Sequence, residues 1–314
     1  MSISRVFAIS ETFYDIIFTK GKPISACPGG AMLNSSISLG RSGVPVSLIS
    51  EFGRDNIGNI IFEFLRDNKV STDYLCLYDG NSPLSLAFLD NRNDATYEFY
   101  EKFPKKRLLI DIPCFSPDDI VMFGSILSVT KEARTKLEEL INAAKNAGST
   151  VLYDPNFRSS QLFRIEEIRS MIFENIAYSN IVRASDEDMR MIQGCRSSEE
   201  AYGFIKENGC DYLIYTASSD GVYLKTPSCS KYYKVPAIET ISTVGAGDSF
   251  NAGIVYMLHA RKDRNLENIT EQVWDEIIGK AIDFSSHVCM SNENYISHDF
   301  ARFQKDISPV TIIV

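Results

Sequence analysis

The sequence predicts an α/β protein with a mostly parallel central sheet and helices on both of its faces. Short apolar runs of strand length recur along the chain, and longer segments with helical spacing of apolar residues lie between them. Strands that alternate with helices in this way form mostly parallel sheets. No internal repeat and no Gly/Ser-rich linker divides the chain, so we expect residues 1–314 to form a single domain.

The expected elements follow from the spacing of apolar residues. Predicted strands lie at 44–50, 119–125, 150–156, 180–185 and 212–217, and predicted helices at 56–67, 131–146, 164–176 and 199–208. Within 131–146 the apolar residues keep a three-to-four spacing, and Gly148 follows as a stop signal.

Two segments, 11–26 and 83–103, break the alternation because they predict strands joined by turn residues with no helix between them. In the second segment, DNRND at 90–94 predicts a hairpin turn between period-two stretches. We expect these pieces to form one small accessory sheet, which is either a lid over a site or a set of ordinary edge strands.

The composition argues against several classes of partner. The formal net charge of −9 argues against a basic face for nucleic acid or an anionic membrane. The seven cysteines are scattered without a C-x-x-C pair, which is typical of free thiols in a reducing compartment. The first residues do not resemble a signal peptide, and no run of 18 apolar residues occurs. We expect a cytoplasmic protein with neither a nucleic acid nor a membrane partner.

The run TVGAGDSFNAG at 243–253 combines a glycine turn with an aspartate at a predicted helix start. Gly245 and Gly247 permit backbone conformations closed to other residues. The first amides of a helix lack internal acceptors and carry partial positive charge, so they can hold an anion. Asp248 beside them could accept the proton of an attacking hydroxyl during phosphoryl transfer. The alternative is an aspartate that only caps the helix.

With Ser242 included, this run resembles the C-terminal signature of the ribokinase-like (PfkB-type) carbohydrate kinase family. The resemblance implies a three-layer α/β/α ribokinase-like fold with a small β-strand lid. It also implies that Asp248 is the catalytic base and that Gly245, Ala246 and Gly247 frame an anion hole.

The N-terminal part is similar to the same family in two places. PGGAMLNSSISLGRSGVPVSLISEFGRDNIG at 28–58 resembles the first signature, in which Gly29 and Gly30 would let a polyol lie against the backbone. The Asn34 amide can donate to and accept from hydroxyls. Asp15 matches the family aspartate that binds sugar hydroxyls, and a carboxylate can accept from two of them. The alternatives are a glycine turn before a helix with Asn34 exposed, and an ordinary strand residue at position 15.

The nucleotide side resembles the family less closely. YTASSDGVYL at 215–224 corresponds to a strand, a T-x-G-x-x-G turn and a second strand, with serine in place of the first glycine. AIDFSSHVC at 281–289 resembles the helix that lines the adenine pocket, although its small residues could simply let helices pack. The residues that the resemblance assigns to ATP are Thr216, Ser218, Gly221, Gly245, Gly247 and Ser285.

The metal sites also depart from the family pattern. SNIVRASDEDM at 179–189 resembles the N-x-x-E region that organises Mg²⁺, with Ser185 and Asp188 at the two key positions. Asp188 could bind Mg²⁺ through water, or could belong to a helix cap. Ser242 stands where many members have an aspartate of a monovalent-cation site, which argues against activation by K⁺.

The resemblance implies an ATP-dependent sugar kinase, most similar to fructokinases and 2-keto-3-deoxygluconate kinases. A ketoacid would need a cation near its carboxylate, and the candidates are Lys102, Lys105, Arg107 and Arg158. Because Lys102 stands where the family arginine is expected, fructose is the favoured substrate.

Ribokinase, nucleoside kinase and an inactive relative that only binds sugar or nucleotide remain alternatives. A dinucleotide oxidoreductase would need a G-x-G-x-x-G turn after the first strand, and the chain has none there. The expected partners are a small sugar and ATP, and the analogy with the family suggests a homodimer through the lid.

Overall fold

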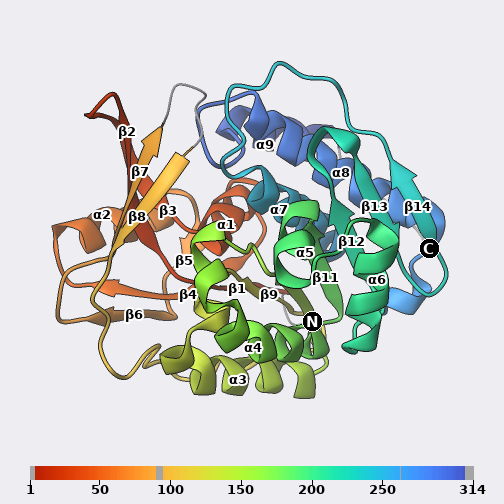
Figure 1. Ribbon diagram of the computed structural model, residues 1–314, viewed down its shortest axis with the longest axis horizontal. Helices are drawn as coiled ribbons and strands as arrows, with labels where there is room; N and C mark the ends of the chain where they lie inside the picture. The colour runs from red at the N-terminus through yellow and green to blue at the C-terminus, as the bar shows by residue number, and fades with distance from the viewer. Residues whose placement is uncertain (1–3, 90–94, 262, 308–314) are drawn as a thin grey trace.

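The computed structural model describes residues 4–89, 95–261 and 263–307, so the turn expected at 90–94 lies outside the described residues (Figure 1). Its larger sheet has ten strands in the order β14-β13-β12-β11-β10-β9-β1-β4-β5, with β6 also paired to β4. These strands are β1 (Val6–Ile9), β4 (Val46–Gly53), β5 (Val70–Ser71), β6 (Leu75–Tyr78), β9 (Ile120–Gly124), β10 (Thr150–Asp154), β11 (Ile181–Ser185), β12 (Leu213–Thr216), β13 (Val222–Lys225) and β14 (Ser230–Tyr233).

Helices cover both faces of this sheet. They are α1 (Ala31–Arg41), α2 (Asn56–Asp67), α3 (Lys131–Asn146), α4 (Ile165–Tyr178), α5 (Asp186–Gln193), α6 (Ser198–Glu207), α7 (Ala246–Ala260), α8 (Glu271–Cys289) and α9 (His298–Ile307). The pairs β12–β13 and β13–β14 are antiparallel, whereas the pairs from β12 across to β5 are parallel. The predicted mostly parallel sheet is therefore confirmed.

Alternate residues of each strand enter two different cores. In β1, Val6 and Ala8 pack with residues of α1, α2, α7 and α8, whereas Phe7 and Ile9 pack with residues of α3, α4, α5 and α6. Successive side chains of a strand point to opposite faces, so a sheet covered on both sides needs apolar residues at every position. This is why the predicted strands are continuous apolar runs, and it confirms the α/β/α layering.

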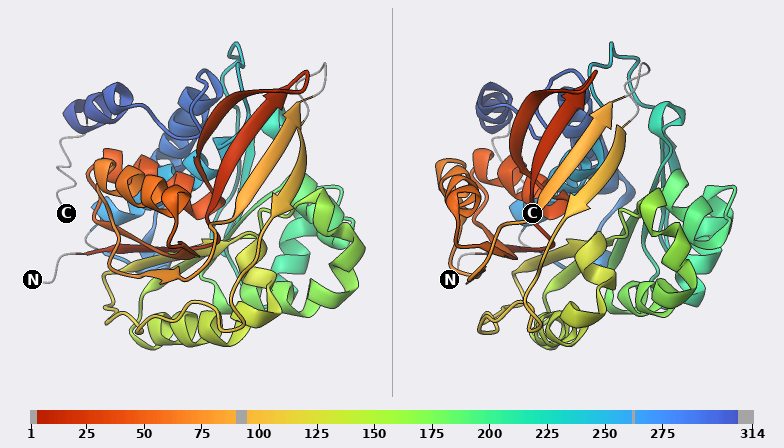
Figure 2. Two further views of the ribbon diagram at one scale, coloured as in Figure 1. Left: turned by 90° about the vertical axis from the view of Figure 1, so that its left-hand side faces the viewer. Right: turned by 60° about the vertical axis from the view of Figure 1, so that its left-hand side comes forward.

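The segments that broke the alternation form one small sheet of order β3-β2-β7-β8. Its strands are β2 (Phe13–Thr19), β3 (Lys22–Gly29), β7 (Leu84–Leu89) and β8 (Ala95–Tyr100). We call it the lid sheet. It projects from the larger sheet (Figure 2), because β2 begins shortly after the carboxyl end of β1 and β7 follows β6.

A capping carboxylate ties the lid sheet to the body. Asp55, the N-cap of α2, accepts from the Gly58 amide at 2.7 Å. It also accepts from the Ser82 amide at 2.8 Å and the Ser82 hydroxyl at 2.6 Å, just before β7 begins. One side chain therefore caps a helix and anchors a lid strand.

The helix α9, near the C-terminus, packs on α8. The ring of Phe300 stacks on His287 at 4.2 Å and contacts Phe284 at 5.5 Å between centroids. Among the helices of the described residues, none has the length and apolar character needed to cross a bilayer.

Candidate functional site

The two glycine-containing signatures meet where α1 and α7 pack together. The Nδ2 of Asn34, in α1, donates to the Oδ2 of Asp248, in the first turn of α7, at 2.8 Å. The hydroxyl of Ser35 donates to the carbonyl oxygen of Asp248, also at 2.8 Å. The fold thus joins two motifs that lie 214 residues apart in the chain. Asn34 is buried, so the alternative of an exposed asparagine is wrong.

The carboxylate of Asp248 is 5% exposed and its pKa is raised to about 7. Burial is the main cause, since it penalises the charged form. The hydrogen bond from Asn34 and the charge of Arg158 lower this pKa, whereas the charge of Asp154 raises it. A base with a pKa near neutrality is suited to accept a proton at physiological pH.

The first turn of α7, which includes Asp248, has main-chain amides without acceptors among the described residues. Gly245 is the N-cap of α7 with φ of 78°, and no side chain caps this helix. A Cβ on Gly245 would collide with the carbonyl of Asn294, so only glycine fits. The Ala246 amide donates to the Thr243 carbonyl at 3.2 Å, but the amides of Gly247 and Asp248 have no acceptor among the described residues. These two amides are free to hold an anion.

The predicted sugar-binding residues meet at the base of the lid sheet. Asp15, in β2, lies directly against Gly29, where any Cβ would overlap its carboxylate. Ser85 is its neighbour in β7 and hydrogen-bonds to it. Burial raises the pKa of Asp15 to about 6, and the bond from Ser85 and the charge of Arg158 oppose the shift. Gly30 has φ of 132° and packs against the Glu11 carbonyl.

The predicted nucleotide residues border a second part of the site. Thr216 ends β12, and Ser218 adopts φ of 45°, the left-handed conformation that the glycine of the family pattern would take without strain. Gly221 has φ of 104° and lies against the Tyr233 carbonyl. A pocket of about 680 Å³ adjoins these residues, and it is lined by Ser219, Lys234, Val235, Pro236, Ala237, Ile282 and Asp283. Ser285 lies one helical turn beyond Ile282 in α8.

Asp188 is buried in a helix cap. Its Oδ2 accepts from the Ser185 amide at 2.8 Å and the Ser185 hydroxyl at 2.7 Å, and its Oδ1 accepts from the Phe157 amide at 2.7 Å. Burial, followed by the charge of Asp154, raises its pKa. Both oxygens are therefore engaged within the protein, and Asp188 is not arranged as a direct metal ligand. The described residues hold no cluster of three or more His, Cys, Asp or Glu placed to bind a metal.

The run DPNFR at 154–158 supplies Asn156, whose place in the site the sequence did not reveal, and Arg158, which the sequence offered only as a partner for a ketoacid. The Nδ2 of Asn156 donates to the Oδ1 of Asp248 at 3.2 Å, so the carboxylate lies between two asparagine amides. Exposed Arg158 lowers the pKa of both Asp15 and Asp248 by its charge. The available signal was the position of this run after a buried strand, because ligands of parallel sheets bind beyond the carboxyl ends of the strands.

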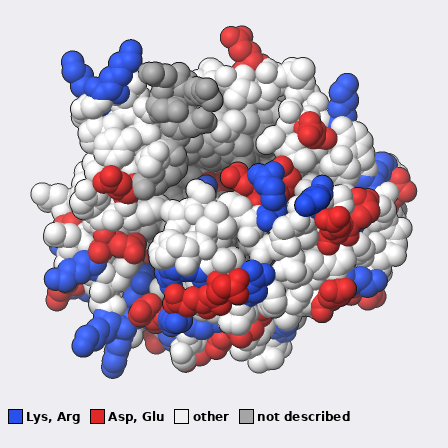
Figure 3. All heavy atoms as spheres, viewed as in Figure 1, with Lys and Arg blue, Asp and Glu red and all other residues white. Residues whose placement is uncertain are grey.

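The other candidate cations lie elsewhere. Arg107 is buried in an ion pair with Glu51 and lies over the Phe103 ring at 3.6 Å, so it is not available to a substrate. Lys102 and Lys105 are exposed. On the face in Figure 3 the surface is hollowed between the lid sheet and the body, and acidic and basic side chains adjoin this hollow.

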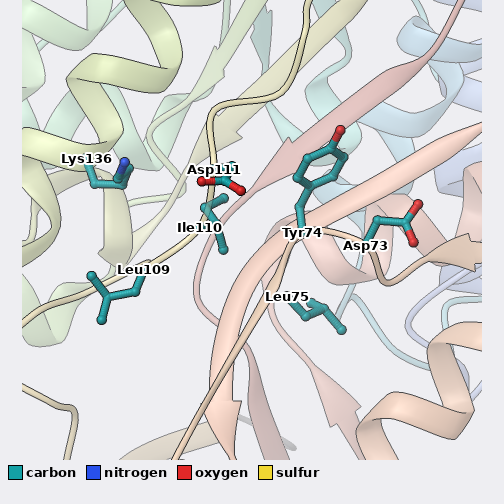
Figure 4. A pocket seen from close by; sticks show the side chains of 7 residues that line it. All are labelled: Asp73, Tyr74, Leu75, Leu109, Ile110, Asp111 and Lys136. Atoms are coloured by element: carbon teal, nitrogen blue, oxygen red, sulfur yellow. The ribbon is translucent and has the colours of Figure 1, made fainter.

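A separate pocket of about 460 Å³ is built from other elements (Figure 4). It is lined by Asp73, Tyr74, Leu75, Leu109, Ile110, Asp111 and Lys136. Asp73 accepts from the Ser71 hydroxyl at 2.9 Å, and Lys136 pairs with Glu139 at 2.7 Å. None of the candidate site residues lines this pocket, so it is not the predicted site.

Known proteins resemble this chain over most of its length. The profile of the pfkB family of carbohydrate kinases matches residues 4–269. The aminoimidazole riboside kinase of Salmonella typhimurium is 26% identical over 261 residues, which is 82% of each chain. A fructokinase of Rhizobium leguminosarum bv. trifolii is 30% identical over 237 residues, covering 73% of this chain and 71% of that protein.

Solved structures show the same fold. The crystal structure of aminoimidazole riboside kinase from Salmonella enterica, complexed with aminoimidazole riboside and an ATP analog, superposes with a TM-score of 0.83 at 23% identity, covering 96% and 99% of the two chains. The fructokinase of Vibrio cholerae O395, with bound fructose, ADP and calcium ion, has a TM-score of 0.83 at 22% identity, covering 93% and 94%.

Proposed function

Because the chain belongs to the pfkB family of carbohydrate kinases, and is thus a phosphotransferase with an alcohol acceptor, we propose that it transfers the γ-phosphate of ATP to a hydroxyl of fructose. The observation that carries this proposal is the buried Asp248 carboxylate, with a pKa of about 7, at the open amides of α7. A general base and an anion site next to each other are what phosphoryl transfer to an alcohol needs.

The two asparagine amides orient the base. Asn34 and Asn156 each donate to a different oxygen of Asp248, which leaves further lone pairs for a substrate hydroxyl. The hydroxyl proton passes to Asp248 as the hydroxyl oxygen bonds to the γ-phosphorus. The bond from this phosphorus to the bridging oxygen breaks at the same time, and ADP leaves with the electron pair.

The amides of Gly247 and Asp248 would stabilise the negative charge of the transferring phosphoryl group. They point out of the first turn of α7 at its positive end, where a transferring phosphoryl group would gain hydrogen bonds. Because they are part of the main chain, they need little reorganisation as charge develops. A bound Mg²⁺ would neutralise charge on the nucleotide, with Asp188 expected to reach it only through water.

On the sugar side, we propose that Asp15 accepts hydrogen bonds from two hydroxyls of the sugar. Gly29 and Gly30 would let the sugar ring lie close to the main chain. Fructose is favoured by several fructokinase relatives at 23–30% identity. Because Arg107 is buried in an ion pair with Glu51, it is not available to bind the carboxylate of a ketoacid. An exposed Arg158 keeps the 2-keto-3-deoxygluconate alternative open to test.

A nucleoside is the second candidate substrate, because the aminoimidazole riboside kinase relative covers 82% of this chain. We further propose that ATP binds along Thr216, Ser218 and Gly221 with its base toward the pocket beside α8. The single domain, closure of the lid sheet, dimerisation through it, lack of K⁺ activation and cytoplasmic location also remain predictions.

The test is a coupled ADP-release assay with MgATP and fructose, ribose, 2-keto-3-deoxygluconate and aminoimidazole riboside. We expect the highest kcat/KM with fructose. Preference for another acceptor would reject the substrate but keep the kinase mechanism. If none of these acceptors led to ADP release at protein concentrations where ATP binds, the result would favour a relative that binds its ligands without turnover.

A further inference from the structure

Arg183, in β11, is a charged side chain buried directly behind the open start of α7. It is 7% exposed, and a Cβ placed on Gly247 would come within 2.9 Å of its Nη1. Its Nη2 donates to the Thr216 hydroxyl at 2.7 Å, and its Nη1 to the Oδ2 of Asp154 at 3.0 Å. One guanidinium therefore touches the predicted anion hole and the first residue of the predicted nucleotide turn.

Asp154, the partner of Arg183, is connected to the proposed base Asp248 through Asn156. It is fully buried at the end of β10, and its Oδ1 accepts from the main-chain N–H of Asn156 at 3.0 Å. Its Oδ2 also accepts from Asn251 in α7 at 2.6 Å. Asn156 in turn donates to Asp248. The ion pair thus links β10, β11, β12 and α7 at the point where these elements bound the site.

Fold stability alone explains this arrangement poorly. A buried ion pair loses more hydration energy than an apolar pair of similar volume, and its replacement by apolar residues is often neutral or stabilising. The Nε of Arg183 is buried without an acceptor among the described residues, so the guanidinium has unused hydrogen-bonding capacity. A buried donor without a partner needs an explanation, and a role in a functional site is one of the explanations known.

We propose that Arg183 is a positioning residue for phosphoryl transfer: it holds the Gly247 turn and Thr216 in fixed relation, and its charge lies behind the amides that receive the phosphate. This inference rests on the proposed kinase function. The charge of Arg183 lowers the pKa of Asp248 whereas that of Asp154 raises it, so the two act in opposite directions on the base. The competing explanation is an ion pair that only joins strands.

The test compares Arg183→Met, Arg183→Lys and a matched control, Arg134→Met. Arg134 is also mostly buried and also spans elements, because it bonds to Asn175 at 2.5 Å and pairs with Glu138 and Glu174. None of these contacts belongs to the site. Melting temperatures and steady-state kinetics are measured for all variants, with ATP and acceptor varied separately.

We expect Arg183→Met to lower kcat/KM for ATP by at least about 100-fold while the KM for the sugar changes less than about threefold. Arg183→Lys should restore about a tenth of the wild-type value, since it keeps the charge but not the planar fork. Arg134→Met should lower the melting temperature and leave kcat/KM near wild type. The positioning role of Arg183 would be overturned if Arg183→Met and Arg134→Met had equal kcat/KM values for ATP. It would also be overturned if the loss of activity in Arg183→Met matched the loss of folded protein.

If Arg183→Met does not fold, Arg183→Lys decides: a wild-type kcat/KM for ATP would overturn the proposal. If the wild-type protein turns over no acceptor, equilibrium binding of ATP separates the two proposals. Weaker ATP binding by at least about tenfold in Arg183→Lys, with Arg134→Met unchanged, would support the positioning role even though the kinase proposal had failed.

Discussion

Asp248, the proposed base in α7, and Asp15, in the lid sheet, are two acids with raised pKa values that are held in different ways. Asp248 is nearly inaccessible, lies between the amides of Asn34 and Asn156, and sits on helices packed into the core. Asp15 is half-buried on a projecting sheet, with Ser85 as its hydrogen-bonding neighbour. The pKa values, about 7 and about 6, are both raised mainly by burial.

This difference is consistent with the proposed roles, in which Asp248 takes part in the chemistry and Asp15 binds the sugar. A group that must meet a reacting atom in one geometry is held by rigid elements, whereas a group that binds the substrate can move with a lid. The two acids should therefore respond differently to substitution, and the predictions below test that contrast.

The largest effect should come from Asp248→Asn. Removal of the base should lower kcat by about 10²- to 10⁴-fold, because a positioned general base contributes a factor of this size. Sugar affinity, measured by calorimetry, should remain within about threefold of wild type. An unchanged kcat would reject the role of Asp248 as the base.

The same substitution should alter the pH dependence of stability. Burial raises the pKa of Asp248 from 3.8 to about 7, so wild-type folding loses stability as the pH rises through this window. The loss amounts to at most about 4 kcal/mol, at about 1.4 kcal/mol per pKa unit. In urea unfolding, the free energy of unfolding of Asp248→Asn should increase relative to that of the wild type between pH 4 and pH 8. A difference that stays constant over this pH range would contradict the shifted pKa.

Asp15→Ala should act on recognition instead of chemistry. Loss of charged hydrogen bonds to hydroxyls should raise the KM for the sugar about 10- to 100-fold, while the affinity for ATP stays near wild type. Asp15→Asn, which keeps one acceptor, is the matched control and should give an intermediate KM. If only nucleotide affinity changed, the assignment of the two sides of the site would be wrong.

The pH profile should distinguish the two acids in the wild-type protein. Because the base must be ionised, kcat/KM should fall about tenfold for each pH unit below about 7. The group with the lower pKa, Asp15, should add a second, steeper limb below about 6. In Asp15→Asn the steeper limb should disappear and the limb near 7 should remain.

The smallest effect should come from the attachment of the lid. Asp55→Ala removes the N-cap of α2 and the anchor of Ser82, and helix caps contribute about 1 kcal/mol. We expect a lower melting temperature and a modest rise in the KM for the sugar. Ser82→Ala keeps the cap and should separate the two contributions.

The periodicity of the chain determined the scaffold closely. The predicted helices 56–67 and 131–146 coincide with α2 and α3, and the lid sheet arises from the two segments where alternation failed. α5 was expected only as the alternative in which Asp188 belongs to a helix cap, because this helix is only eight residues long and mostly polar. These features were predictable because helix spacing, strand alternation and glycine turns are local properties of the chain.

Sequence motifs also predicted site roles for Asp248, Asn34 and Asp15, but only the tertiary structure decided which charges lie near them. It placed Arg107 against Glu51, engaged Asp188 in the cap of α5 and brought Arg183 behind Gly247. Pairing between buried side chains depends on contacts between distant segments, and burial sets the pKa of each acid. Neither property is encoded in local spacing, so the chain order determined the elements and their packing determined the chemistry of the site.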